Sequence, residues 1–91
     1  MFLRIADGSI PNRQQFNQCC NELKCTTFHF INDDRLGSCN LSIDQLWAEI
    51  SNAHDEMIAL EQAIYFDSRQ YIKRYDWLKS ILSTLKIEWN Q

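Results

Sequence analysis

Four side chains that can bind zinc lie between residues 20 and 39. They are Cys20, Cys25, His29 and Cys39, in the pattern C-x4-C-x3-H-x9-C. Zinc sites usually carry two cysteines close together on a turn, often as C-x2-C, so that both thiolates reach one metal. This chain has no C-x2-C pair, and Cys20 falls within an expected helix. We therefore expect buried thiols rather than metal ligands, and a small zinc-binding regulator is kept as one alternative function.

The other reactive side chains form no catalytic pattern. His29 alternates with two phenylalanines in an expected strand, and His54 lies at the edge of an apolar helix face. Glu49 and Glu56 share one side of a helix, but two turns separate them by ~10 Å, too far for one reacting centre. Two isolated glycines cannot build a phosphate-binding loop. The sequence predicts a protein that is not an enzyme, with no cofactor and no small-molecule substrate.

Charge divides the second half of the chain. Residues 40–67 hold six acids and no Lys or Arg, whereas residues 68–87 hold five bases and one acid. The net charge of -3 for the whole chain does not reveal this division. Basic helices with nearby aromatics can grip phosphates and stack on bases. The candidate site for a protein or protein–RNA partner is Arg69, Lys73, Arg74, Trp77, Lys79 and Lys86. A second candidate, an acidic face for a basic partner, is Asp44, Glu49, Asp55 and Glu56.

The alternative explanation of this charge division lies within the fold. If the acidic and basic segments are neighbouring antiparallel helices, their charges can simply pair, at ~0–1 kcal/mol for each exposed pair. The net negative charge also disfavours a free-standing reader of duplex DNA.

The apolar pattern predicts one helix-rich α+β domain over residues 1–91, with a small antiparallel sheet. We expect a strand at 2–6, a turn at 7–9, a helix at 11–24 that starts near Ser9 and Pro11, a strand at 25–31, a loop at 32–38 and a second strand near 39–41. Within the first helix, Cys19 and Cys20 are adjacent and diverge, so we do not expect both to reach the core.

A long helix is the strongest element in the pattern. Ser42 and Gln45 form a capping box, and an apolar stripe follows it: Ile43, Leu46, Ile50, Ala53, Met57, Leu60 and Ile64. Asp67 and Ser68 can cap a further helix whose apolar arc runs from Tyr71 to Leu85. Facing stripes predict an antiparallel helical hairpin, although one continuous bent helix stays open because no glycine marks the turn. The tail 85–89 alternates and can pair as a strand with residues 2–5.

Location and surface follow from composition. No signal-peptide pattern and no apolar run of transmembrane length occur, which predicts a cytoplasmic protein with no membrane partner. Three Trp, three Tyr and five Phe are many for 91 residues, so some aromatics should lie at a contact surface.

A short, acidic, glycine-poor chain with divided charge resembles the small inhibitors encoded by phages and mobile elements. It is similar in size and character to anti-CRISPR proteins, which bind the CRISPR surveillance complex. The resemblance covers the whole chain in general character and no position in particular, so it transfers no site residue. It implies a non-enzymatic inhibitor in the host cytoplasm that blocks the nucleic-acid path of a protein–RNA assembly. A structural or dimerisation module built on the 43–66 helix is the other alternative.

Overall fold

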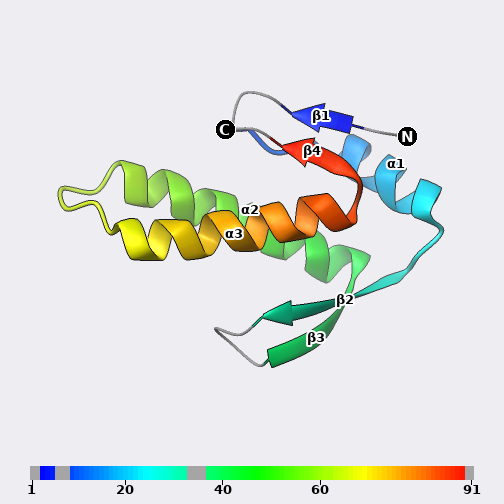
Figure 1. Ribbon diagram of the computed structural model, residues 1–91. Coiled ribbons are helices and arrows are strands. Elements are labelled where there is room, and N and C mark those ends of the chain that lie inside the picture. The colour runs from blue at the N-terminus through cyan, green and yellow to red at the C-terminus, as the bar shows by residue number, and fades with distance from the viewer. Residues whose placement is uncertain (1–2, 6–8, 33–36, 90–91) are drawn as a thin grey trace.

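The computed structural model describes residues 3–5, 9–32 and 37–89 (Figure 1). These residues confirm a small α+β domain with three helices and an antiparallel strand pair. The elements follow the order β1 (Leu3–Ile5), α1 (Arg13–Leu23), β2 (Thr27–Asn32), β3 (Gly37–Ser42), α2 (Ile43–Glu61), α3 (Ser68–Thr84) and β4 (Ile87–Trp89).

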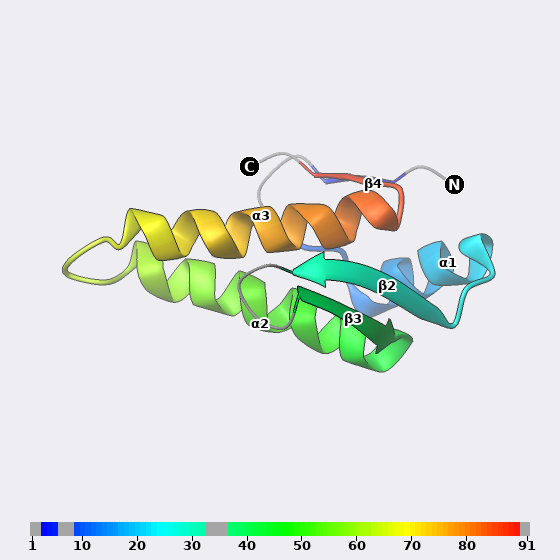
Figure 2. The same ribbon diagram turned by 60° about the horizontal axis from the view of Figure 1, so that its bottom comes forward.

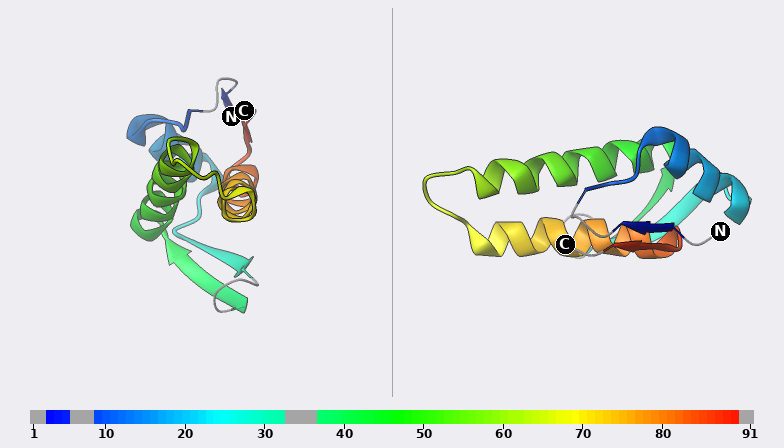
Figure 3. Two further views of the ribbon diagram at one scale, coloured as in Figure 1. Left: turned by 90° about the vertical axis from the view of Figure 1, so that its left-hand side faces the viewer. Right: turned by 90° about the horizontal axis from the view of Figure 1, so that it is seen from above.

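An antiparallel hairpin of α2 and α3 forms the centre of the fold. Viewed along the hairpin, the β2–β3 ribbon lies on one side of the two helices, and the β1–β4 ribbon lies on the other (Figure 3). α1 packs beside the first half of α2. The far end of the hairpin, where residues 62–67 connect the helices, extends beyond both ribbons (Figures 1 and 2). None of the described helices is long and apolar enough to cross a bilayer.

The β2–β3 ribbon confirms the alternation read from the sequence. Phe28 and Phe30 are buried, whereas Thr27 and His29 are exposed. The two strands pair antiparallel from Thr27 opposite Ser42 to Asn32 opposite Gly37. β3 is longer at both ends than the expected 39–41, whereas β2 starts two residues later and ends one residue later than the expected 25–31. Ladder hydrogen bonds draw flanking polar residues into the strands, which an apolar pattern alone does not reveal. The rest of the expected loop, residues 33–36, lies outside the described residues.

The tail does form a strand with the N-terminus, and the pairing is parallel. β1 lies along β4 with Leu3 opposite Ile87. Parallel neighbours need a long connection, and here most of the chain supplies it. Lys86, at φ 62°, turns the chain out of α3 into β4. Trp89 then packs 5.2 Å from the ring of Tyr75 and donates from Nε1 to the Ser9 carbonyl at 2.8 Å.

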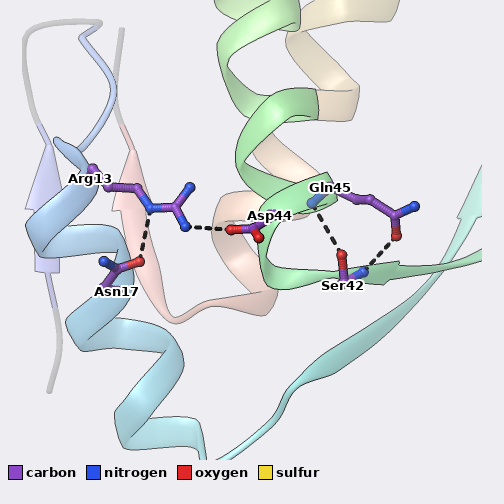
Figure 4. A network of polar contacts seen from close by, with 5 residues as sticks. All are labelled: Arg13, Asn17, Ser42, Asp44 and Gln45. Carbon is purple, nitrogen blue, oxygen red and sulfur yellow. Dashed lines mark hydrogen bonds and ion pairs between the residues drawn. The ribbon is translucent and has the colours of Figure 1, made fainter.

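Capping side chains decide where the helices begin. The capping box of α2 is present: Ser42 Oγ accepts from the Gln45 backbone at 3.3 Å, and Gln45 Oε1 accepts from the Ser42 backbone at 3.0 Å (Figure 4). The expected start of α1 near Ser9 and Pro11 was wrong, because Asn12 forms the same reciprocal box with Gln15 and starts the helix after it. The Asp67 carboxylate caps α3 as expected.

The long helix ends earlier than the apolar stripe indicated. α2 stops at Glu61, so Ile64 lies in the connection with 94% of its surface exposed. The Asp67 cap starts a separate helix, which rules out one continuous bent helix.

The middle of the stripe is buried inside the chain, whereas Ile43 and Leu60 near its ends are half-buried. Leu46, Ile50, Ala53 and Met57 belong to the same buried cluster as the apolar side of α3, which supplies Leu78, Ile81, Leu82 and Leu85. The chain's own α3 covers this part of the stripe. The alternative of a dimer built on the stripe therefore has no exposed apolar surface there to use.

Candidate binding surface

The outer side of α3 carries an exposed basic face, defined here as Arg69, Lys73 and Lys79. All three side chains are exposed, with the acid Asp76 among them. At ~100° per residue they occupy about a third of the helix circumference, on the side turned away from α2. Lys79 Nζ also lies 5.8 Å from the ring centre of Tyr75, its neighbour one turn earlier. This part of the predicted site is therefore presented by one rigid helix.

Lys86 is exposed but does not share that face. It follows the C-cap Leu85 and has a left-handed backbone, so it lies past the end of α3. The predicted continuation of the basic face to residue 86 assumed a longer helix.

Trp77 is not available for stacking on a base, which corrects its predicted role. Only 7% of its surface is exposed, and its ring meets Phe30 edge-on at 5.5 Å. Its Nε1 donates to Glu49 Oε1 at 3.2 Å. The β2–β3 ribbon covers this side of α3, and the helical pattern of α3 alone cannot show that a separate ribbon packs there.

Arg74 is also buried, so its predicted place on the basic surface is wrong. Its aliphatic stem lies in the α2–α3 contact, as long basic side chains allow. Its Nε lies 3.6 Å from Glu56 Oε2, which makes an ion pair across the hairpin.

The predicted acidic face does not form as one surface. Glu49 and Glu56 face α3, whereas Asp55 is exposed on the far side of α2. Asp44 turns toward α1 and accepts from Arg13 Nη2 at 2.6 Å (Figure 4).

The Arg13–Asp44 contact serves the fold. Arg13 Nε also donates to Asn17 Oδ1 at 3.1 Å, which holds the guanidinium above the rings of Phe16 and Trp47. Both charged groups stay accessible to water, so the ion pair contributes at most ~1 kcal/mol. Asp44 lies in the first turn of α2, where a carboxylate also meets the positive end of the helix dipole.

Three acids of α2 contact α3 in sequence along the hairpin. Glu49 meets Trp77, Glu56 meets Arg74, and Glu61 Oε1 accepts from the Tyr71 hydroxyl at 2.8 Å. The alternative of charge pairing inside the hairpin is thus confirmed for Arg74. The exposed bases Arg69 and Lys79 lie outside this series of contacts.

The four zinc candidates are not brought together where the structure describes them. Cys20 is buried, Cys25 is exposed with Sγ 3.4 Å from the Leu23 carbonyl, and His29 is exposed with Nδ1 2.9 Å from Asn40 Oδ1. The side chain of Cys39 lies outside the described residues. Among the described side chains, no group of three or more possible ligands is placed to hold a metal.

Cys19 and Cys20 both reach the core, against expectation. Phe16 and Leu23 lie between them on the helix surface, so the two thiols flank one buried side of α1. Burial raises the pKa of Cys19, and Glu22 adds to the rise. Burial also raises the pKa of Cys20, with a further contribution from Cys19. Both thiols stay protonated near neutral pH, which makes them poor nucleophiles.

The outer side of α1 is lined with amides. A shallow, open depression runs along Arg13, Gln14, Asn17, Gln18, Asn21 and Glu22. Amides donate and accept hydrogen bonds but exchange no proton near neutral pH. Arg13 and Glu22 lie beside these amides, so the whole lining of the depression is polar.

Large hydrophobic residues near the far end of the hairpin are exposed, which the sequence pattern did not predict. They are called the apolar tip below: Ile58, Ile64, Tyr65, Phe66 and Ile72. Phe66 lies 5.2 Å from the ring of Tyr71, so the connection folds back on α3 at that point. The sequence signal for these exposed residues was the apolar run Ile64–Phe66. Its exposure could be inferred only once the structure showed that α2 ends at Glu61. Tyr65 and Phe66 confirm that some aromatics lie at the surface.

The chain matches no protein-family model, no curated protein and no solved structure. Its function is therefore inferred from its own surfaces.

Proposed function

We propose that this protein is a non-catalytic binding protein that docks on a nucleoprotein complex through the basic face of α3. The observation that carries the proposal is that the bases of α3 divide into a buried one and an exposed group. Arg74 is buried in the hairpin with Glu56, while Arg69, Lys73 and Lys79 are exposed on the opposite side of the same helix. A group of exposed bases on a rigid helix attracts phosphates at short range.

The remaining charge favours a partner of mixed character over bare nucleic acid. The chain is acidic overall at -3, so long-range attraction to duplex DNA is absent. Asp55 is exposed on α2, on the other side of the hairpin from the basic face. A nucleoprotein complex offers both kinds of complement, because it presents RNA phosphates beside Lys- and Arg-rich protein.

The specific target that we propose is a CRISPR surveillance complex in the host cytoplasm. The support is the resemblance in size, acidity and divided charge to anti-CRISPR proteins. Such a complex holds its guide RNA in a positively charged channel that target DNA must enter. A small protein bound at the channel mouth, with bases on RNA phosphates and acids on channel lysines, blocks that entry without any chemical step.

A pull-down tests the proposal directly. The tagged protein is incubated with purified surveillance complexes of several types, with and without ribonuclease treatment. We expect capture of at least one type, and loss of capture after ribonuclease where RNA forms part of the contact. Failure to capture every type overturns the proposed target. Capture that ribonuclease leaves unchanged overturns the phosphate contact and assigns the binding to protein alone.

A further inference from the structure

Two thiols lie on either side of the turn that ends α1. Cys20 is in the last turn of the helix with only 1% of its surface exposed, and Cys25 is exposed just beyond the helix. Residues 24–26 connect the helix to β2 (Figure 1). A buried thiol and an exposed thiol therefore flank one short connection between a helix and a strand.

The chain reverses direction between the two thiols. Lys24 has a left-handed backbone, with φ 56° and ψ 32°, and its N–H donates to the Asn21 carbonyl at 3.1 Å. A left-handed residue and this hydrogen bond are both features of the Schellman turn, with which many helices end. In that turn, the residue after the left-handed one contacts the residue five positions earlier. Here those two positions are Cys25 and Cys20.

The Cys25 thiol is folded back on the end of α1. Its Sγ lies 3.4 Å from the Leu23 carbonyl oxygen. Burial raises the pKa of Cys20, and Cys19 and Cys25 add to the rise. Because such an effect falls off with distance, the thiols of Cys20 and Cys25 lie near each other. At Cys19, by contrast, burial and Glu22 raise the pKa, so Cys20 is the nearer partner of Cys25.

We propose that Cys20 and Cys25 form a reversible disulfide by reaction with small disulfides such as glutathione disulfide. The contact between their positions in a Schellman turn is within the reach of this bond, which joins Cα atoms about 4.4–6.8 Å apart. The adjacent pair Cys19 and Cys20 does not qualify. Cα atoms across one trans peptide are only about 3.8 Å apart, and the two side chains diverge by ~100° on the helix.

The disulfide forms through two thiol–disulfide exchanges. The Cys25 thiolate attacks one sulfur of glutathione disulfide, which forms a mixed disulfide at Cys25 and releases one glutathione thiolate. The Cys20 thiolate then attacks the Cys25 sulfur, so that the protein disulfide forms and the second glutathione leaves as a thiolate. The two protein thiols lose two electrons, and glutathione disulfide gains them and becomes two molecules of glutathione.

Burial assigns the order of the two steps. Cys25 is exposed and meets glutathione disulfide first, whereas Cys20 is covered. The raised pKa of Cys20 leaves little thiolate at neutral pH, but the thiolate of such a thiol is a stronger nucleophile, and the turn holds it beside its target. Closure should therefore become faster as the pH rises. The product joins the end of α1 to the start of β2, which makes this junction sensitive to the redox state of its surroundings.

Peptide mapping identifies the bond. The purified chain is incubated with reduced and oxidised glutathione, free thiols are blocked with a maleimide, and the chain is digested with trypsin. Lys24 lies between the two thiols, so the disulfide links the peptide of residues 14–24 to the peptide of residues 25–35. We expect this linked pair in most of the oxidised chain. Glutathione that stays on Cys25 without closure overturns the proposal, and so does a link to Cys39 in the peptide of residues 36–69.

Three variants assign the two sulfur atoms. Cys25→Ser should abolish the link and leave the circular dichroism spectrum unchanged, because the side chain is exposed. Cys20→Ala should also abolish the link and leave glutathione on Cys25. Cys19→Ala removes the adjacent buried thiol and is the matched control, which should form the link as wild type does. A link that persists in Cys20→Ala, or one that is lost in Cys19→Ala, assigns the bond to Cys19 and overturns the proposal.

The same exchange in urea tests whether the folded turn positions the pair. The equilibrium constant for closure should be at least about tenfold larger in the folded chain than in the unfolded chain, because the turn has already brought the thiols together. Equal constants in buffer and in urea overturn the role of the turn. All these measurements use the purified chain alone, so their outcomes are independent of the capture of a nucleoprotein complex.

Discussion

The Nε atom of Arg74 lies 3.6 Å from Oε2 of Glu56, so the two side chains form an ion pair that is too long for a hydrogen bond. The Arg74 side chain is 8% exposed, whereas that of Glu56 is 48% exposed. Arg74 Nε is a buried polar atom that lacks a hydrogen-bond partner within the described part of the chain. The pair joins α2 to α3 mainly because the aliphatic part of the Arg74 side chain packs between the two helices. The charge of the pair is held at the edge of that contact.

Replacing Arg74 by Met should therefore change stability little. Methionine keeps the buried aliphatic volume and removes a guanidinium that is only partly satisfied, so we expect the free energy of unfolding to stay within ~1 kcal/mol of wild type. Arg74→Ala should cost about 2 kcal/mol, because it empties the same space. Urea denaturation measures both. A loss above about 3 kcal/mol for Arg74→Met would show that the charge itself holds the hairpin together.

Trp77 packs the hairpin against the β2–β3 ribbon, and replacing it by Phe should destabilise the protein more than Arg74→Met does. Trp77→Phe loses the hydrogen bond to the Glu49 carboxylate and leaves space beside Phe30, so we expect a loss of about 1–3 kcal/mol in the free energy of unfolding. Glu49→Gln keeps an acceptor and should cost less than Trp77→Phe. Asn52→Ala, on an exposed position of α2, should stay within about 0.5 kcal/mol. Equal losses for Trp77→Phe and Asn52→Ala would contradict the assigned burial of Trp77.

Much of the secondary structure could be predicted from local patterns in the sequence. The structure confirms the capping box at Ser42, the cap at Asp67 and the alternation around His29. Each of these features depends on residues that are close together in the chain, so the sequence alone can predict it. The start of α1 was missed because two possible caps, Ser9 and Asn12, lie close together, and only backbone geometry shows which one is used.

The candidate site was less predictable, because burial depends on which elements pack together. A helical wheel separates Arg69 and Lys73 from the core, and both are exposed. It also placed Trp77 on the surface, since the wheel of α3 has no information about a ribbon that packs against its side. The apolar tip depends on where α2 ends, and an apolar run such as Ile64–Phe66 fits a helix or a connection equally well.

The two adjacent buried thiols of α1, Cys19 and Cys20, should make the stability of the protein fall at alkaline pH. Burial raises the folded-state pKa of Cys19 and Cys20 above the unfolded value of 9.0. The unfolded chain therefore releases these protons first, and the free energy of unfolding decreases as pH rises above 9.0. The contribution is fully present below that pH. Urea denaturation over a pH series measures the decrease.

The variant Cys19→Ala with Cys20→Ala is the comparison for that pH series. It should be less stable at neutral pH, because two buried side chains become smaller, yet its stability should fall less steeply above pH 9.0. Identical alkaline slopes for the variant and the wild type would show that other groups cause the decrease. As a second readout, a thiol reagent at neutral pH should modify the exposed Cys25 well before either buried thiol.

The most direct measurement for the proposed function is the affinity of a charge-reversed basic face for a captured surveillance complex. The variant Arg69→Glu with Lys79→Glu reverses two exposed bases of α3 and leaves Lys73, the apolar tip and the hairpin contacts in place. Lys24→Glu, an exposed base at the end of α1, is the matched control. We expect the α3 variant to bind about tenfold more weakly or worse, with an unchanged circular dichroism spectrum, and the control to bind like wild type. Equal affinity of the wild type and the α3 variant would contradict the basic face as the docking surface.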